Sequence, residues 1–251
     1  AVVARPDALL ELCRTFLRVG ALRVTGMATE PGEVLRFLDA IVVPARNTAF
    51  GFVHDVAVDP AGYNVAHTAE GLPPHNDFAS YAHPPSGQLL HMLVNDVAGG
   101  DSLLVDGFDV LERLRAENPA HIDVLARVPV AHRQWSTDVE TWSRAPLIRI
   151  SATGDIVGLR FSNQLVQPLD PEHPSIAAWY VAYQRLAQLI ADPASQMQFR
   201  LEAGQMLMVN GHRVLHARTA FDPSSGARRL QDAYFYDDDI RGTAAVLSGD
   251  R

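Results

Sequence analysis

The start of the chain shows a helix, strand, helix pattern of apolar positions. Residues 6–20 place apolar side chains at helical spacing and end on Gly20, which predicts an amphipathic helix. Residues 22–27 alternate as a strand does, and residues 31–41, with proline in the first turn, predict a second amphipathic helix. We therefore expect an αβα preface over residues 1–45.

Short β-rich runs separated by turn-rich segments follow this preface. The runs occupy residues 50–58, 88–97, 101–106, 126–135, 147–152, 155–161, 197–201, 205–210, 213–218 and 229–236. Two helical insertions interrupt them, at residues 108–119 and 174–192. Strands this short bury enough surface only when two sheets face each other, so we expect a mainly β jelly roll with helical insertions. A doubly wound sheet is the weaker alternative, because strictly alternating βαβ units are missing.

The chain shows no sign of a division into domains. It has no internal repeat, low-complexity tract or Ser/Gly-rich linker. Its 251 residues, 47% of them hydrophobic, are enough to bury a large core. We therefore expect a single catalytic domain over residues 1–251, with the preface at 1–45 and the β core with its helical insertions at 46–240.

The basic residues of the chain are all arginine. Lys and Arg together number 21 and no lysine occurs, which excludes Schiff-base aldolases, pyridoxal enzymes and P-loop NTPases. Asp and Glu number 29, and the net charge of −8 argues against nucleic acid and anionic membranes as partners. The expected partner is a small-molecule substrate, and a homodimer is the one macromolecular assembly that we consider.

Cysteine usage and hydropathy favour a cytoplasmic protein. Cys13 is the only cysteine, so an internal disulfide and a thiolate-rich metal cluster are excluded, and we expect Cys13 to lie in the core. No apolar stretch approaches the roughly 20 residues that span a bilayer, and the first residues lack a signal-peptide pattern. The first residue is Ala, which leaves open that the chain begins inside a longer gene product.

Two histidines and an aspartate form a candidate metal site. His75 and Asp77 lie two residues apart in LPPHNDF, so in an extended segment both point to one face and can bind one cation. Such a tripeptide is more often an ordinary loop, and a third ligand is needed. His216, in the strand-like NGHRVLHAR, is the candidate, although a histidine on an apolar strand is commonly a core residue. Two imidazoles and one carboxylate bind iron in non-haem Fe(II) oxygenases.

One arginine suggests a co-substrate for such a site. Arg228 follows His216 in GARRLQDAYFY, where a strand can direct its guanidinium into the barrel. A buried guanidinium needs a carboxylate partner, which the dicarboxylate 2-oxoglutarate provides, and Ser102 can add a hydroxyl group. The alternative for Arg228 is a surface ion pair with one of the acids at 237–239.

Several segments together resemble a known enzyme family. NVAHTAEGLPPHND, PPSGQLLHMLVNDVAGGDSLLVDGFDVLERLRAENP, and RVLHAR followed by ARRLQDAY are similar to the catalytic domain of gamma-butyrobetaine dioxygenase and trimethyllysine dioxygenase, in the taurine dioxygenase-like (TauD/TfdA) group. The resemblance extends from about Phe50 to Ile240. It implies a double-stranded β-helix, a cupin-like jelly roll, with Fe(II) on His75, Asp77 and His216.

The resemblance also implies 2-oxoglutarate and O2 as co-substrates. It places 2-oxoglutarate on Arg228. Asn64 matches a family position that contacts 2-oxoglutarate, and Leu90 matches one whose backbone lines that site. Some relatives carry a small N-terminal module with its own zinc site, for which this chain has neither the length nor the cysteines.

The substrate pocket departs from the family pattern. Members that act on gamma-butyrobetaine hold its trimethylammonium group in an aromatic cage, and the matching positions here are Phe50, His54, His67 and Tyr234. Only Tyr234 is a direct match, and the two imidazoles suit a head group that forms hydrogen bonds. We therefore expect gamma-butyrobetaine to be a poor substrate and a less methylated or differently shaped zwitterion to be preferred.

Two further residues are expected in the same pocket. Asn163, in RFSNQ, matches a family position that faces the anionic end of the substrate, and Phe78 directly follows the metal motif. Plain core packing is the alternative role for Phe50 and Phe78.

The sequence thus predicts an Fe(II)/2-oxoglutarate-dependent dioxygenase that hydroxylates an unactivated C–H bond of a small zwitterionic amine, betaine or amino-acid-like substrate, with formation of succinate and CO2. Desaturation, cyclisation or rearrangement are alternative outcomes with the same cofactors. A zinc-dependent hydrolase on the same triad would need a general base, which LPPHNDFASY does not offer. A jelly-roll binding protein without catalysis is a further alternative, disfavoured because all three metal ligands are present.

Overall fold

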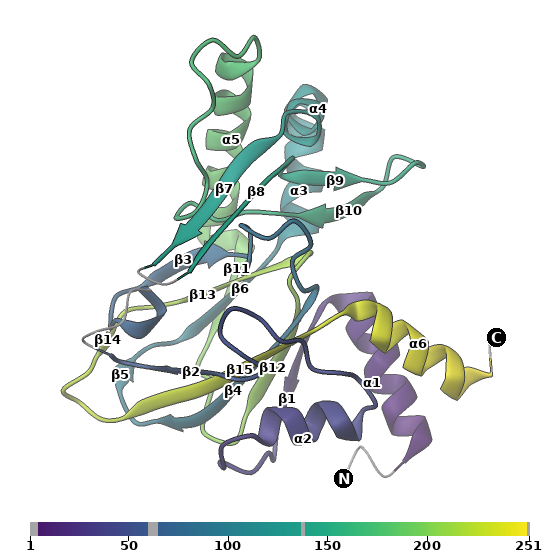
Figure 1. The fold of residues 1–251 in the computed structure, drawn as a ribbon, viewed down its shortest axis with the longest axis vertical. Coiled ribbons are helices and arrows are strands. Elements are labelled where there is room, and N and C mark those ends of the chain that lie inside the picture. The colour runs from purple at the N-terminus through teal and green to yellow at the C-terminus, as the bar shows by residue number, and fades with distance from the viewer. Residues whose placement is uncertain (1–4, 60–64, 137–138, 250–251) are drawn as a thin grey trace.

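Two antiparallel sheets form the centre of the molecule in the computed structural model, which describes residues 5–59, 65–136 and 139–249 (Figure 1). The larger sheet has the order β1 (Ala21–Val24), β12 (Met206–Asn210), β4 (Gly87–Asn95), β15 (Arg228–Phe235) and β2 (His54–Ala57). The smaller sheet has the order β11 (Gln196–Phe199), β6 (Ser102–Asp106), β13 (Val214–Arg218) and β3 (Leu72–His75). A short pair joins β5 (Ala98–Gly99) to β14 (Phe221–Asp222).

Apolar side chains from both sheets pack in one cluster. Met92 and Leu230 of the larger sheet belong to the same buried cluster as Val214 of the smaller sheet, and Phe199 packs against it. The two sheets therefore face each other, as expected from the short strands. The arrangement is mainly antiparallel β with helices.

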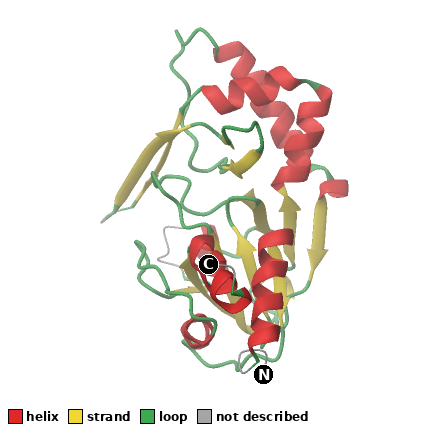
Figure 2. Ribbon diagram, turned by 90° about the vertical axis from the view of Figure 1, so that its right-hand side faces the viewer, coloured by secondary structure: helices red, strands yellow, loops and turns green. Residues whose placement is uncertain are grey.

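Three helices cover the outer face of the larger sheet: α1 (Pro6–Val19), α2 (Glu33–Ala40) and α6 (Asp237–Ser248) (Figures 1 and 2). Their buried side chains include Phe16, Phe37 and Ile240, which belong to the same apolar cluster as Phe235 of β15. Cys13 is fully buried in this layer, as predicted. The observed order α1, β1, α2 confirms the αβα pattern at the start of the chain.

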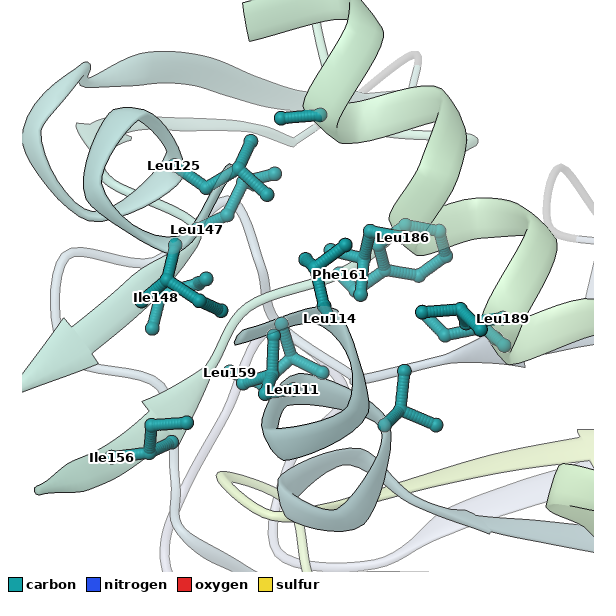
Figure 3. Packing of buried hydrophobic residues seen from close by; sticks show 14 of the residues in the cluster. Leu111, Leu114, Leu125, Leu147, Ile148, Ile156, Leu159, Phe161, Leu186 and Leu189 are labelled. Carbon is teal, nitrogen blue, oxygen red and sulfur yellow. The ribbon is translucent and has the colours of Figure 1, made fainter. Parts of the chain in front are cut away.

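A second core lies among three helices that rise from the sheets. These helices are α3 (Gly107–Glu117), α4 (Pro119–Arg127) and α5 (Ile176–Ala191), and they pack with β7 (Val130–Trp135), β9 (Ile148–Ile150) and β10 (Ile156–Leu159). The strand β8 (Glu140–Ala145) pairs with β7. Figure 3 shows Leu114, Leu125, Leu186 and Ile148 converging from four of these elements. The helical insertion therefore has an apolar core of its own and supports the β7–β8 hairpin.

The structure corrects the prediction around residue 118. The predicted helix over 108–119 stops at Asn118, whose side chain accepts a hydrogen bond from the backbone N–H of Ala120. With Pro119 in the first turn, these residues start a new helix, α4. The predicted strand over 126–135 therefore begins only at Val130.

Several elements were not predicted. Helix α6 was missed because the three acids at its start suggest a polar chain terminus. Acidic residues in fact stabilise the N-terminus of a helix, and the buried Ile240 anchors this one. Both β3, which contains two prolines, and β8, which is mostly exposed, lack an alternating apolar pattern. No helix within the described ranges is long and apolar enough to cross a bilayer.

Candidate metal and co-substrate site

Strand pairing brings His75, Asp77 and His216 together. His75 ends β3 and pairs directly with His216 of β13, and Asp77 lies two residues beyond the strand. Directly opposed residues of antiparallel strands carry their side chains on the same face. One ligand atom from each of the three residues lies within 4.8 Å of the other two. Residues far apart in the sequence thus form one cluster.

The side chains of this cluster are oriented toward a common point. The Nδ1 atom of His75 lies 2.9 Å from the carbonyl oxygen of Pro73, which can only accept, so Nδ1 carries the proton. Its free Nε2 lies 3.3 Å from Asp77 Oδ1, and His216 Nε2 lies 3.9 Å from Asp77 Oδ2. A backbone carbonyl that fixes the ring in this way is typical of metal-binding histidines. The donor set therefore fits an iron of the two-histidine, one-carboxylate type.

The protonation states in the cluster suit a metal at two of its three residues. Burial, with the charge of His75, lowers the pKa of His216 to about 4. Burial alone would raise the pKa of Asp77, but His216, His75 and a hydrogen bond from Tyr234 hold it well below its usual range. For His75, the effect of burial is outweighed by Asp77, which raises the pKa of the imidazole, so protons compete with a metal at this residue.

Two side chains that donate hydrogen bonds hold the carboxylate of Asp77. Gln88 Nε2 and the hydroxyl group of Tyr234 each donate to Asp77 Oδ2 at 2.7 Å. Gln88 Nε2 also lies 3.1 Å from the Tyr234 oxygen. Gln88 was not identified from the sequence. The sequence could have indicated Gln88, because it lies two residues before Leu90 on β4 and both side chains therefore point to one face of the strand.

The cluster lies in a cavity of about 520 Å³, a volume typical of small-molecule sites. Its wall is built from both sheets, together with residues 133–136 of the β7–β8 hairpin. Of the predicted site residues, the following line it: Phe50, His54, His75, Asp77, Phe78, Leu90, Ser102, His216, Arg228 and Tyr234.

Arg228 is buried in this wall and Ser102 lines the same cavity. Within the described ranges, the Nε atom of Arg228 has no hydrogen-bond partner and no carboxylate lies at ion-pair distance from it. The suggested ion pair with an acid at 237–239 is therefore not formed. Burial, with the charges of Arg218 and Arg200, lowers its pKa to about 10, so an anionic ligand would stabilise this guanidinium.

A second buried arginine, Arg218, was not identified from the sequence. It lines the same cavity, and its guanidinium donates to the backbone carbonyl oxygens of Ala66, Thr68 and Glu70. Arg218 thereby fixes the segment before β3 and leaves Arg228 as the less engaged of the two cations.

Most of the predicted substrate residues form one aromatic cluster. Phe50 stacks on His54 with ring centroids 4.3 Å apart, and Phe78 meets Tyr234 edge to face at 4.7 Å. His67 contacts His54, with their Nε2 atoms 3.1 Å apart, but does not line the cavity. Phe78 is buried and also lines the cavity, so core packing and a place in the site are compatible.

Of the two predicted asparagines, the structure describes only Asn163, which does not line the cavity. Asn163 is exposed and its side-chain oxygen accepts a hydrogen bond from the hydroxyl group of Tyr183, while its neighbours Ser162 and Gln164 line the cavity. The structure thus does not bring Asn163 to the site. Asn64 lies outside the described residues.

A carboxylate that the sequence reasoning missed lies in the cavity wall. Asp232 of β15 is 4% exposed, and its Oδ2 lies 3.2 Å from the Tyr234 hydroxyl and 3.5 Å from His54 Nδ1. Burial, with the charge of Asp77, raises its pKa against the opposing effect of His54. Side chains alternate between the two faces along β15, and this alternation could have indicated Asp232. Its cavity face carries Arg228, Leu230, Asp232 and Tyr234.

Comparisons with known proteins agree with this arrangement. The family model described as "Taurine catabolism dioxygenase TauD, TfdA family" matches residues 3–234. Gamma-butyrobetaine dioxygenase of Pseudomonas sp. (strain AK-1) is 36% identical over 98% of this chain and 64% of its own length. The Homo sapiens enzyme of the same name is 29% identical over 88% of this chain and 58% of its own length. The chain thus spans less than two thirds of these relatives.

Solved structures show the same fold. An asparagine oxygenase in complex with Fe(II), 2S,3S-3-hydroxyasparagine and succinate is 18% identical, with a TM-score of 0.70 over 93% of this chain and 81% of its own. The non-heme iron oxygenase OrfP in complex with Fe and alpha-ketoglutaric acid is 17% identical, with a TM-score of 0.69 over 93% of this chain and 80% of its own.

Proposed function

The chain belongs to the TauD, TfdA family of dioxygenases, and from this premise we propose that it is an Fe(II)/2-oxoglutarate-dependent oxygenase. Its substrate would be a small zwitterionic amine, betaine or amino-acid-like molecule, and its reaction the hydroxylation of a C–H bond. When bound, iron and 2-oxoglutarate supply the O2-dependent oxidation, in which 2-oxoglutarate becomes succinate and CO2. The two facing sheets would form the double-stranded β-helix of a single catalytic domain.

One observation carries this proposal. Two imidazoles and a carboxylate converge in a cavity that also contains Arg228, a buried arginine with no carboxylate partner in the described part of the chain. A buried guanidinium without an anion is costly, and the far carboxylate of 2-oxoglutarate would pair with it in bidentate fashion. A hydrolase that used the same triad would need this cation only for an anionic substrate.

The side chains of the site have positioning roles. His75, Asp77 and His216 would hold the iron, while Gln88 and Tyr234 keep the Asp77 carboxylate in one orientation. None of these five side chains needs to transfer a proton in this scheme.

Other walls of the cavity would bind the organic molecules. Arg228 and Ser102 would bind 2-oxoglutarate beside Leu90, and the cluster that contains Phe50 and Phe78 would exclude water from the substrate. The contributions of His54, His67 and Asn64 to binding, a cytoplasmic location and a homodimer stay predictions.

The test is the conversion of 2-oxoglutarate to succinate under air. We expect succinate to form only when Fe(II) is added, and to increase when a suitable zwitterionic amine is present. Replacement of Fe(II) by Zn²⁺ should abolish the reaction. Hydrolytic activity with Zn²⁺ and no succinate with Fe(II) would contradict the proposal and support the hydrolase.

A further inference from the structure

The proposed function leaves the carboxylate of Asp232 without a role. Asp232 lies on β15, opposite His54 of the edge strand β2 and Leu90 of β4. Its side chain is 6% exposed and forms part of the cavity wall. A carboxylate is rarely buried to this extent unless a cation or several hydrogen-bond donors accompany it.

The donors around Asp232 are too few. The hydroxyl group of Tyr234 lies 2.7 Å from Asp77 Oδ2 and 3.2 Å from Asp232 Oδ2, and its single proton can serve only one of them. The shorter distance assigns it to Asp77. His54 Nδ1, at 3.5 Å, is a distant donor to Oδ2, and Oδ1 has no partner within the described residues.

Apart from His54, which is charged only when protonated, no cationic side chain within the described residues pairs with Asp232. The two arginines of the cavity, Arg218 and Arg228, are both within reach of the Phe221 ring, at 4.9 and 5.4 Å, and neither forms an ion pair with Asp232. Oδ1 of Asp232 therefore lacks a donor, and the only charged neighbour of Oδ2 is the distant His54 imidazole, beside the aromatic cluster of the cavity.

The aromatic rings near Asp232 are partly engaged with one another. One face of Phe50 is covered by the His54 ring, at an interplanar angle of 13°, and Phe78 meets Tyr234 edge to face. Fewer free ring faces remain for a quaternary ammonium, whose binding depends on such faces. A carboxylate, by contrast, binds best a cation that donates hydrogen bonds to it.

We propose that Asp232, supported by His54, binds the protonated amine of the substrate through at least one N–H group. The substrate would then be a primary, secondary or tertiary ammonium compound and not a quaternary one. This inference rests on the proposed function, because it assigns the cavity to a substrate, and it makes Asp232 a specificity-determining residue of that site.

The experiment measures binding along two methylation series. 4-Aminobutyrate and lysine, each with no methyl group up to three on the terminal nitrogen, are titrated calorimetrically into the protein with Fe(II) and 2-oxoglutarate in the absence of O2. In the wild-type protein, the dimethylated member of at least one series should bind at least about tenfold more tightly than the trimethylated member, as expected for one hydrogen bond to a charged group. In Asp232→Asn this ratio should fall to about one.

A matched control is available on the neighbouring strand. Asp55 of β2 is exposed and pairs with Arg229, so Asp55→Asn removes the same charge outside the cavity and should keep the wild-type ratio. Equal weakening of all members in Asp232→Asn would indicate a structural role and overturn the proposal. The proposal would also be overturned if the wild-type protein bound no member of either series, or if it preferred the trimethylated member. The wild-type measurements therefore test the proposal even if the Asp232→Asn variant does not fold.

Failure of the proposed function has a different signature. Binding of Fe(II) and of 2-oxoglutarate is measured first, and its absence would refute the oxygenase. The methylation series is then repeated without them, because the cavity and Asp232 belong to the chain itself. If the protein still prefers ligands with N–H groups in the absence of Fe(II) and 2-oxoglutarate, the role of Asp232 is supported even though the oxygenase is refuted.

Discussion

Adjacent arginines on β15 illustrate how a single residue is assigned a role. Arg228 is buried in the cavity wall, while Arg229 is exposed and pairs with Asp55 at 2.7 Å. Successive residues of a strand point to opposite faces, so the two side chains have different environments despite their identical chemistry. The register of β15 therefore decides which arginine can bind 2-oxoglutarate.

Arg228→Ala should weaken 2-oxoglutarate binding by about two to three orders of magnitude, since breaking a buried ion pair costs about 3 to 5 kcal/mol. Arg229→Ala should leave that affinity nearly unchanged, because its ion pair is exposed to solvent. Anaerobic titration of 2-oxoglutarate into both iron-loaded variants measures the difference. The reverse order of effects would show that the other arginine binds the co-substrate.

Gln88→Leu should lower iron affinity by about 10- to 100-fold while all three proposed ligands remain, because the Asp77 carboxylate loses one of its two fixing hydrogen bonds. Gln231→Leu is the control, since Gln231 is equally buried but contacts Asp55 and Gly32 and not the metal cluster. Competition with a chelator gives both affinities. Equal affinities in the two variants would refute the positioning role of Gln88.

At the scale of elements, close packing joins β4 to β15. A Cβ atom at Gly87 would lie 2.2 Å from Cε2 of Phe235, whose ring is fully buried under α1 and α6. This approach explains why β4 begins with glycine, since any side chain there would displace the ring.

Gly87→Ala should lower the free energy of unfolding by about 1 to 3 kcal/mol, the usual cost of overpacking a core. Gly211→Ala should change it little, because the nearest atom to its Cβ would be 3.7 Å away. Urea denaturation of both variants tests this expectation. A Gly87→Ala protein as stable as the wild type would show that Phe235 can move without cost.

The sequence predicts elements well where periodicity is strong. The amphipathic spacing of α1, α2 and α5 and the apolar runs of β4, β12 and β13 were read correctly. The break at Asn118 and helix α6 were missed, because a helix cap and an acidic first turn also occur in loops.

Residue type alone selects candidate metal ligands, whereas a role that depends on neighbouring side chains needs the structure. His75, Asp77 and His216 could be selected by residue type, and the structure brings them together. The alternation of β15 could place Asp232 on the cavity face, but only the structure shows that this carboxylate is buried with few donors.

At the scale of the whole molecule, two apolar cores support one cavity. The two facing sheets provide most of its wall, and the helical insertion contributes residues 133–136 through the β7–β8 hairpin. A substitution that loosens the packing among α3, α4 and α5 should therefore also change the shape of the cavity.

His132, on the inner face of this hairpin, should make the stability of the molecule depend on pH. Burial, with the charge of Arg160, lowers its pKa to about 4, below the ordinary value of 6.5. The unfolded chain then takes up a proton before the folded one, so stability is full above pH 6.5 and falls as the pH drops toward 4.

The loss attributable to His132 is about 3 kcal/mol over that interval. In His132→Leu, the decrease in unfolding free energy between neutral pH and pH 4 should be smaller than in the wild type by this amount. Urea denaturation at a series of pH values measures both decreases. Identical decreases would show that His132 is not held neutral by burial.

The central claim is that His75, Asp77 and His216 hold an iron beside which 2-oxoglutarate binds. Its most direct test is anaerobic equilibrium dialysis of the wild-type protein and His216→Ala against Fe(II) and 2-oxoglutarate. The account predicts that the wild type retains both in equal, stoichiometric amounts and that a folded His216→Ala protein retains neither. Stoichiometric iron in His216→Ala, or iron without 2-oxoglutarate in the wild type, would contradict it.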